Sequence, residues 1–238
     1  MEKTIVTYLG HSAWSVETPK NLFIFDYDKP PKKGSYIDLS GMKDKPVYFF
    51  SSHNHGDHYS KRLNQEVSQQ NNMIFITGGF HAAFNNSITI MPRQTKNIRD
   101  ISVYTAASTD IGVCYLVKAK GLTIFHSGDL ANWPDNEETS VSYSDEIDYI
   151  ASLNNTVDIA FIPVCTFDWH QDVCLLEGAL YAVKKLNPGF VFPMHANGHE
   201  DLYKRFAKYA ENNGIANSII CMERVGDTWI CPEDVCDR

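Results

Sequence analysis

Features of a membrane, secreted or nucleic-acid-binding protein are scarce in this sequence of 238 residues. No apolar run approaches the roughly 18 residues that a membrane-spanning helix needs, so no membrane span is expected. The opening segment MEKTIVTYLGHSAW lacks a basic stretch followed by a long apolar one, so we expect no secretory leader and a cytoplasmic protein. No run of Lys or Arg offsets the net charge of -8, which makes general nucleic-acid binding unexpected.

Cysteine is also sparse, and its spacing suggests no framework. Six cysteines are present, and no two of them form a C-x-x-C pair. A chain of this length can bury a core without disulfides, so reduced thiols are expected. The segment CPEDVC, from Cys231 to Cys236, can hold a metal or a disulfide, but its gap fits no zinc pattern well, and we interpret it as a loose tail. Linkers and low-complexity tracts are missing too, which predicts one domain over residues 1–238.

The composition that is present is that of a globular protein, with 43% hydrophobic and 21% charged residues. Patterning predicts strands in the first half at 3–9, 14–18, 21–28, 46–52, 73–79, 87–91 and 101–106. The second half predicts two strands joined at Lys120–Gly121, strands at 157–164, 190–194, 218–225 and 228–231, and helices at 143–155, 175–186 and 202–214. Strands followed by strand–helix units in both halves predict an α/β domain.

Three histidines and one aspartate crowd the end of the apolar run PVYFFSS. They are His53, His55, Asp57 and His58. Alternate side chains of an extended segment face the same way, so the first three can converge, and Gly56 lets the backbone turn to bring His58 round. Zinc prefers such imidazole and carboxylate ligands, with manganese or iron as alternatives. Burying these groups for packing alone would be costly, so the cluster predicts a metal site.

The segment SSHNHGDHYS resembles the H-x-H-x-D-H signature of the metallo-β-lactamase superfamily. Further segments resemble that family in the same order: FDYD with Asp26, IFHSGDL with Gly128 and Asp129, and VFPMHANGH with His195. LGHSAW and HSGD are most similar to the branch that holds ascorbate-6-phosphate lactonase and N-acylphosphatidylethanolamine phospholipase D. The resemblance covers nearly the whole chain and implies a four-layer αββα sandwich.

The resemblance also implies a set of ligands for one or two metal ions. One ion would be held by His53 and His55, the second by Asp57, His58 and His195, with Asp129 bridging the two. Asp129 and His195 each follow an apolar run, so a common sheet edge can gather them. The alternatives are a core histidine for His195 and a helix-capping carboxylate for Asp129.

The sequence departs from the family where a third histidine of the first site belongs. The aligned position is about Ser108 in AASTDIGVCYLV, and no histidine lies near it. Asp110 can supply a replacement oxygen ligand, water can complete the sphere, or the first metal can be weak or absent. Asp110 is equally a turn residue before a strand. His11 is expected to orient a ligand or Asp26 from outside the coordination sphere, with a simple strand-end hydrogen bond as the alternative.

Several other residues near the expected strand ends are candidates for a role at the site. Strand alternation predicts that His126 points away from the metals. Trp133 and Trp169 follow two strand ends and either wall an apolar pocket or cap the core. Basic residues of two loops can meet a phosphate or be plain surface: Lys29, Lys32 and Lys33, and Arg93, Lys96 and Arg99.

These expectations define a metal-dependent hydrolase that uses a metal-bound hydroxide on a small ester, lactone or phosphoester, an anionic substrate being one candidate. Asp57 is the expected catalytic residue, which orients the hydroxide or accepts its proton. One alternative is a phosphodiesterase or nuclease of the same fold. Another is a non-catalytic metal-binding sensor with a degenerate first site, which the missing histidine would favour. The sequence is compatible with a homo-oligomer.

Overall fold

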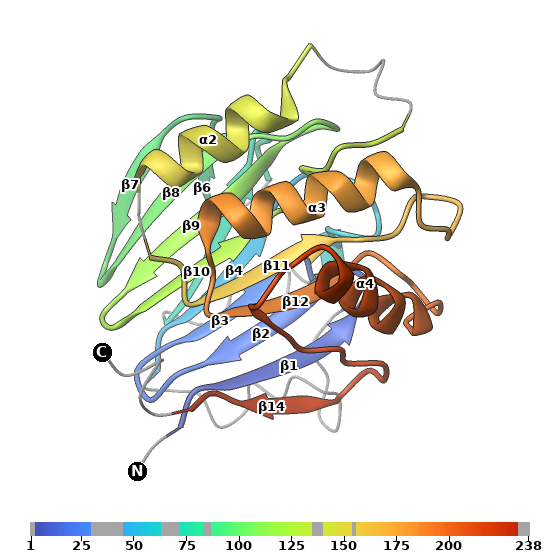
Figure 1. The fold of residues 1–238 in the computed structure, drawn as a ribbon. Coiled ribbons are helices and arrows are strands. Elements are labelled where there is room, and N and C mark those ends of the chain that lie inside the picture. Colours follow the sequence, from blue (N-terminus) through green and yellow to red (C-terminus); the bar gives the residue numbers. More distant parts are fainter. Residues whose placement is uncertain are drawn as a thin grey trace.

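Two β-sheets face each other in the structure, and helices lie over the second sheet (Figure 1). The computed structural model describes residues 3–29, 45–62, 72–82, 87–134, 140–153 and 156–232. The first sheet contains β1 (Ile5–Gly10), β2 (Ala13–Glu17), β3 (Leu22–Phe25), β4 (Val47–Ser51), β5 (Met73–Gly78), β6 (Ser87–Ile90) and β14 (Thr228–Ile230). The second contains β7 (Thr95–Ile98), β8 (Ile101–Ala107), β9 (Val113–Ala119), β10 (Leu122–His126), β11 (Ile159–Pro163), β12 (Phe190–Met194) and β13 (Ser218–Ile219).

Both sheets mix parallel and antiparallel neighbours. The first has the order β14-β1-β2-β3-β4-β5-β6, and the second has the order β13-β12-β11-β10-β9-β8-β7. Strands β3 to β6 run parallel, as do β10 to β13. In this arrangement the carboxyl ends of parallel strands lie along one edge of each sheet, which is where ligand sites form in α/β folds.

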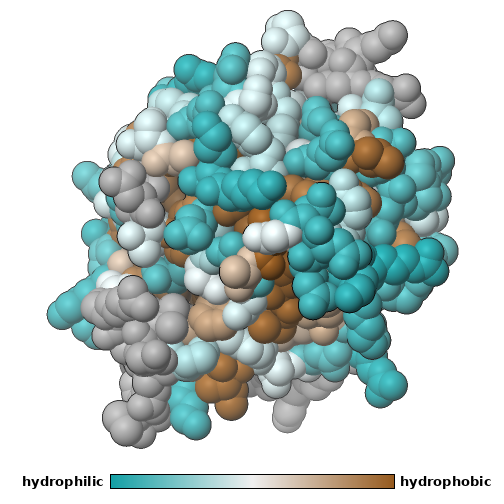
Figure 2. All heavy atoms as spheres, viewed as in Figure 1, coloured by the Kyte–Doolittle hydropathy of each residue, from teal (hydrophilic) through white to brown (hydrophobic). Residues whose placement is uncertain are grey.

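The helices follow the amphipathic segments that the sequence predicts. They are α2 (Tyr143–Leu153), α3 (Val173–Leu186) and α4 (Asp201–Asn212). Helix α3 begins after Asp172, whose side chain accepts a hydrogen bond from the Cys174 backbone N–H, and it ends at Asn187 in the left-handed conformation. None of the described helices is long and apolar enough to cross a bilayer. Hydrophilic side chains cover most of the face drawn in Figure 2, and apolar atoms show mainly in its middle.

Side-chain alternation divides the core into two parts. In β3, Phe23 and Phe25 belong to the large cluster between the sheets, whereas Leu22 and Ile24 belong to a separate buried cluster. Because successive side chains of a strand point to opposite faces, the second cluster lies on the outer face of the first sheet. The predicted α/β class with stacked sheets and flanking helices is confirmed. The second helical layer that the expected four-layer sandwich implies stays a prediction, because the segments that would form it lie outside the described residues.

Two details of the fold differ from the sequence prediction, and a third is one that the prediction left open. Strand β7 was expected as a basic loop; it pairs antiparallel with β8 at the sheet edge, where its mostly exposed side chains leave no apolar pattern. The strand expected at 218–225 is short, because only Ser218 and Ile219 pair with β12. Strand β14 crosses to the first sheet and pairs with β1, a choice that no local pattern specifies.

The expectation of reduced thiols is wrong for one of the five described cysteines. Cys114, Cys165, Cys174 and Cys221 are free. Cys231 is disulfide-bonded, and the other half of the bond lies outside the described residues. Sequence spacing alone says nothing about how closely two thiols approach, so the loose-tail interpretation of CPEDVC was open to this correction.

Candidate metal centre

The predicted site residues emerge at one edge of the sandwich, each just after a strand. They are Asp26 after β3, His53 after β4, Asp129 after β10 and His195 after β12. Direct contacts join the two sheets at this edge: the Val113 N–H donates to the Ser52 carbonyl oxygen, and the Tyr115 hydroxyl donates to the Ser51 carbonyl oxygen at 2.8 Å. Strand ends from distant parts of the chain therefore meet in space.

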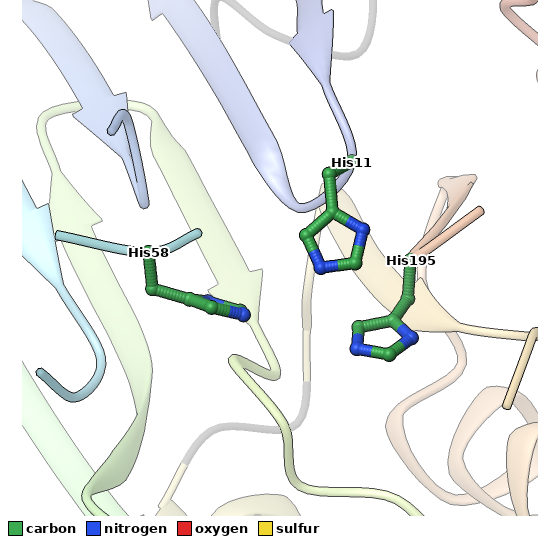
Figure 3. A group of neighbouring side chains, drawn as sticks. All are labelled: His11, His58 and His195. Atoms are coloured by element: carbon green, nitrogen blue, oxygen red, sulfur yellow. The ribbon is translucent and has the colours of Figure 1, made fainter. Parts of the chain in front are cut away.

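Three of the site residues have a left-handed backbone. The φ angles are 53° at His11, 45° at Asp26 and 75° at His195. This region is uncommon for residues other than glycine, and such strain concentrates at functional sites. The His195 backbone N–H donates to the His11 carbonyl oxygen, which couples the β1–β2 turn to the end of β12. Figure 3 shows the rings of His11, His58 and His195 turned toward a shared space.

Gly128 lets the Gly-Asp turn of the second sheet approach the first sheet. Its φ is +52°, and a Cβ at this position would lie 2.6 Å from the Ser52 Cβ. A side chain there would push the turn away from the end of β4. The glycine of this motif thus sets the distance between Asp129 and the histidine cluster.

Asp26 holds two histidine rings in place. Its Oδ1 accepts from the Ser52 N–H at 2.7 Å, and its Oδ2 accepts from the Ser52 hydroxyl and from His58 Nδ1, each at 2.8 Å. Because the Ser52 hydroxyl proton is donated to Asp26, the Ser52 oxygen accepts from His53 Nδ1 at 2.9 Å. Burial alone would raise the pKa of Asp26, but the neighbouring histidines, His58 first, lower it to about 2.

The hydrogen bonds fix the same tautomer on three rings. His58 Nδ1 donates to a carboxylate, His53 Nδ1 to the Ser52 oxygen, and His195 Nδ1 to the Cys165 carbonyl oxygen at 2.9 Å. In the neutral form each ring therefore carries its lone pair on Nε2. This is the orientation in which a histidine ligates metal through one nitrogen while the other is hydrogen-bonded.

The three Nε2 atoms surround the Asp129 carboxylate. Asp129 Oδ1 lies 3.4 Å from His58 Nε2 and 3.8 Å from His195 Nε2, and Oδ2 lies 3.6 Å from His53 Nε2. All three Nε2 atoms and Asp129 Oδ1 are buried without a hydrogen-bond partner. Unpaired buried polar atoms are costly, and convergence of this donor set fits a divalent cation. His53, His58 and Asp129 form a group whose ligand atoms are close enough to hold one ion.

A second group lies where the expected third histidine is missing, and its ligand atoms are also close enough together to hold one ion; we call such groups metal-competent. It consists of His53, His55 and Asp110. Asp110 Oδ2 lies 3.5 Å from His55 Nδ1 and 3.8 Å from His53 Nε2. The Asp110 N–H donates to the Ser108 hydroxyl oxygen at 3.2 Å, which closes the turn that carries the carboxylate. Of the alternatives left open by the sequence, this arrangement favours a replacement oxygen ligand.

His11 contacts one of the predicted ligands. The sequence suggested that it orients a ligand or Asp26, and its Nε2 lies 3.2 Å from Asp57 Oδ2. It forms a third metal-competent group with His58 and His195. Asp57 is half-exposed, and its Oδ2 lies 3.8 Å from His58 Nε2. The nearby His11 imidazole holds the pKa of the Asp57 carboxyl well below its ordinary value.

Burial and charge pull the remaining pKa values in opposite directions. Burial opposes charge on His58, but Asp129, Asp26 and Asp57 outweigh it and raise the pKa of His58 to about 10. Burial raises the pKa of Asp129 to about 7 and lowers that of His53 to about 3. The metal-free cluster therefore retains a proton on His58 at neutral pH, and metal binding has to compete with it.

His126 points away from the cluster, as predicted. Its Nε2 donates to the Ser12 carbonyl oxygen at 2.9 Å, and its Nδ1 accepts from the Gly128 N–H at 3.1 Å. The ring stacks on Phe25 with the ring centroids 4.9 Å apart. Both nitrogens are satisfied, so His126 supports the Gly-Asp turn and is not a ligand candidate.

The basic residues predicted for phosphate binding are largely engaged elsewhere. Arg93 Nη2 lies 2.6 Å from Glu146 Oε1, and Lys96 Nζ donates to the Thr89 carbonyl oxygen. Lys32 and Lys33 fall outside the described residues. Lys29 is exposed, and its Nζ lies 4.0 Å from where a Gly10 Cβ would be, next to His11.

Known proteins share both the sequence pattern and the fold. The family model described as "Beta-lactamase superfamily domain" matches residues 5–195. A UPF0173 metal-dependent hydrolase of Pyrococcus furiosus is 26% identical over 81% of this chain and 84% of its own length. The metal-dependent hydrolase YtkL of Bacillus subtilis is 27% identical over 81% of this chain and 85% of its own length.

Solved structures extend the similarity over nearly all of the chain. Igni18, a metallo hydrolase from Ignicoccus hospitalis, superposes with a TM-score of 0.70 at 19% identity, covering 96% of this chain and 98% of that one. YhfI, a metallo-β-lactamase fold protein of Bacillus subtilis, gives a TM-score of 0.65 at 12% identity, covering 97% of this chain and 100% of that one. At these identities the structures show the fold alone.

These similarities confirm the predicted class of the protein, but they do not test the predicted branch or substrate. A metal-dependent hydrolase of this fold is confirmed as the class of the protein. None of the four relatives is named for a substrate, and the lactonase-like branch stays a prediction. The match over residues 5–195, together with the shared architecture, shows that this chain belongs to the β-lactamase superfamily domain family and has the metallo-β-lactamase fold.

Proposed function

We propose that the chain hydrolyses a small ester, lactone or phosphoester with the help of one or two divalent metal ions, zinc being the first candidate. One observation supports this above the others. The buried Nε2 atoms of His53, His58 and His195 have no hydrogen-bond partner, although the opposite nitrogen of each ring is a fixed donor. Such rings are oriented for a cation.

In the proposed centre the ligands divide into two sets that share a bridge. His53, His55 and Asp110 would hold one ion, Asp57, His58 and His195 the other, and Asp129 would bridge them. The two Asp129 oxygens face different histidines, Oδ2 toward His53 and Oδ1 toward His58 and His195. Asp26 lies outside both sets and keeps the rings oriented.

A bound divalent cation supplies Lewis-acid activation of water, by lowering its pKa towards about 7, and stabilises negative charge developing on the substrate. Asp57 would orient the attacking water, because its carboxylate is half-exposed and faces His58. Its pKa lies far below neutrality, so it is a weak proton acceptor and a better orienting group. His11 would restrain the Asp57 carboxylate from the other side.

Charge favours a small ester or lactone over a polyanion. The net charge of -8 repels nucleic acids. Arg93 pairs with Glu146 and Lys96 donates to the Thr89 carbonyl oxygen, which makes these two cations less available for a phosphate. Lys29, beside His11, is the described cation best placed to meet an anionic substrate group. We place the protein in the cytoplasm because four described cysteines are free, with the Cys231 disulfide as the feature against it.

Metal analysis and a substrate panel test the proposal. Protein purified without added metal is analysed for its elements and assayed on p-nitrophenyl acetate, a γ-lactone and bis-p-nitrophenyl phosphate. We expect one or two zinc ions per chain and turnover of an ester or lactone that chelation abolishes and zinc restores. His81→Ala is the control, since His81 is exposed and belongs to no metal-competent group among the described residues.

Three outcomes would contradict the proposal. Turnover that survives complete chelation would exclude the metal mechanism. Iron with visible absorbance and no hydrolysis would point to redox chemistry instead. One tightly held ion without turnover of any substrate would support the sensor alternative.

A further inference from the structure

Three aromatic rings border His195, and one of them, Trp169, also lies beside His11. The ring centroids of Trp133 and Phe167 each lie 5.2 Å from that of His195, and the centroid of Trp169 lies 6.4 Å from it. Trp133 follows β10, whereas Phe167 and Trp169 follow β11. We call these three side chains the aromatic wall.

The wall is attached to the metal centre at one end and open at the other. The Trp133 indole N–H donates to the Asp129 carbonyl oxygen at 3.0 Å, and the side chain is buried. Phe167 stacks on Trp133 with the centroids 4.6 Å apart, yet it is 54% exposed. An aromatic ring that lies open beside convergent polar groups matches the usual lining of a ligand site.

A hydrogen-bonded turn holds Phe167 and Trp169 in position. The Thr166 hydroxyl donates to Asp168 Oδ1 at 2.7 Å, the Thr166 N–H donates to the His170 carbonyl oxygen, and the Trp169 N–H donates to the Thr166 carbonyl oxygen. Trp169 has a left-handed φ of 64°, a strained conformation for a bulky residue. The rings are therefore preorganised, which reduces the ordering cost of binding.

Charge at the site favours a neutral group on the wall. Any cation there would be repelled by the metal ion proposed a few ångströms away, and an anion gains nothing from the negative ring faces. Cation–ring contacts within the described part of the chain occur on Tyr149, Tyr104 and Tyr181, not on the wall. Of the three rings, Phe167 offers the exposed surface for apolar contact, whereas Trp133 is buried beneath it and Trp169 is partly covered by His199.

We infer that the substrate carries an apolar group, aryl or short alkyl, that packs on the exposed ring of Phe167 at the open end of the aromatic wall while the adjoining carboxyl-type carbon reaches the metal centre. The position of the scissile bond rests on the proposed hydrolase function. The affinity of the wall for an apolar group does not.

A matched set of carboxylates tests binding without turnover. Acetate, phenylacetate and glycine betaine each have one carboxylate. On the neighbouring carbon, acetate carries only hydrogen, phenylacetate a neutral ring, and glycine betaine a cationic trimethylammonium group. Their dissociation constants are measured by calorimetry, with tryptophan fluorescence as a second readout, on zinc-loaded protein. We expect phenylacetate to bind at least about tenfold more tightly than acetate. The Phe167→Ala variant should lose most of that advantage and bind acetate as the wild type does.

The control variant is Met91→Ala. Met91 is a similarly exposed apolar residue, 45% accessible, that lies just after β6 and outside the wall. It should retain the full preference for phenylacetate. Equal binding of acetate and phenylacetate by the wild type, or an unchanged preference in Phe167→Ala, would overturn the inference. Tighter binding of glycine betaine than of phenylacetate would overturn it in favour of a cation cage.

Turnover of two esters separates this inference from the proposed function. p-Nitrophenyl acetate and p-nitrophenyl phenylacetate share a leaving group and differ only in the phenyl ring. We expect a higher kcat/KM for the phenylacetate ester and an approximately tenfold smaller ratio in Phe167→Ala. If neither ester is cleaved while phenylacetate still binds through Phe167, the hydrolase proposal fails and the wall stands. If both are cleaved equally by wild type and variant, the wall fails and the hydrolase stands.

Discussion

The metal-competent edge and the opposite end of the sandwich both contain buried polar atoms without hydrogen-bond partners, yet only one of them has the form of a metal site. At the opposite end, Thr4 Oγ1 and Asn21 Oδ1 are unpartnered beside a cavity of about 200 Å³. The carboxylate there is satisfied, because Asp100 accepts from the Tyr48 hydroxyl at 2.6 Å and from Asn21 Nδ2 at 3.0 Å.

The two ends differ in the kind of atom that lacks a hydrogen-bond partner and in the direction in which these atoms point. At the far end two isolated oxygens face a small cavity, and water can satisfy each of them. At the metal-competent edge three imidazole nitrogens converge on one carboxylate, and their other nitrogens are fixed as donors. Buried unpaired atoms alone are therefore weak support for a metal site. Convergence of one ligand type around a shared point is strong support.

Removing one convergent imidazole should have the largest effect. In His58→Ala the second position loses its most central ligand, so we expect zinc content to fall by at least one ion per chain and hydrolysis to fall at least a hundredfold, roughly the cost of losing a ligand or its support. Asn21→Ala at the far end should change neither. Zinc content is measured by elemental analysis after dialysis. If His58→Ala keeps the zinc content of the wild type, the claim that the convergent histidines form the metal site is wrong.

Asp110 offers a sharper test, because it stands near the position of the missing histidine. Asp110→Ala should lower the affinity of one zinc ion by about 10–100-fold and leave the other bound. Asp110→His should restore binding through an imidazole. Stepwise zinc titration with a chromophoric chelator distinguishes the two ions. If Asp110→Ala binds both ions like the wild type, the carboxylate is a turn residue and not a ligand.

Acid should weaken the metal-competent edge through Asp26. Its folded pKa of about 2 lies below its ordinary 3.8, so its ionised form adds stability above about pH 4, and this contribution is lost as pH falls through about 2. At about 1.4 kcal/mol per pKa unit, the lowering from 3.8 to about 2 corresponds to about 2–3 kcal/mol.

The measurement is urea unfolding of metal-free wild type and Asp26→Asn. Asparagine keeps the shape and removes the charge, so the gap between the two proteins should be widest above pH 4 and should shrink at lower pH. If the difference in unfolding free energy between the two proteins does not change with pH, the histidine partners do not keep Asp26 ionised in the folded protein.

The smallest effect is expected at the far end. Thr4→Val removes a buried hydroxyl that has no partner in the structure, so it should change the free energy of unfolding by less than about 1 kcal/mol and can even stabilise the fold. Zinc content should not change. A loss of several kcal/mol would show that Thr4 is bonded to ordered water that matters for stability.

Local patterns were sufficient for much of the fold and for the first half of the site. His53, His55 and Asp57 follow a buried strand at alternate positions, and strand and helix periodicity located most elements. Asp129 and His195 required the family resemblance, because a single residue after an apolar run has several common roles.

Other features depend on contacts between distant segments and had no local signal. Asp57 lies against His11 because the β1–β2 turn folds over the cluster, with His11 in a left-handed conformation. Phe167 is one exposed ring in a loop, and only the packed structure shows it beside Trp133. The pairing of β14 with β1 and the disulfide at Cys231 are likewise set by tertiary structure.

The most direct test of the account is anomalous diffraction at the zinc edge from crystals of protein loaded with zinc. We predict a peak within bonding distance of His58 Nε2, His195 Nε2 and Asp129, and a second peak between His53 and Asp110 if both positions fill. Crystals with zinc in the solvent but no peak among these side chains would contradict the central claim.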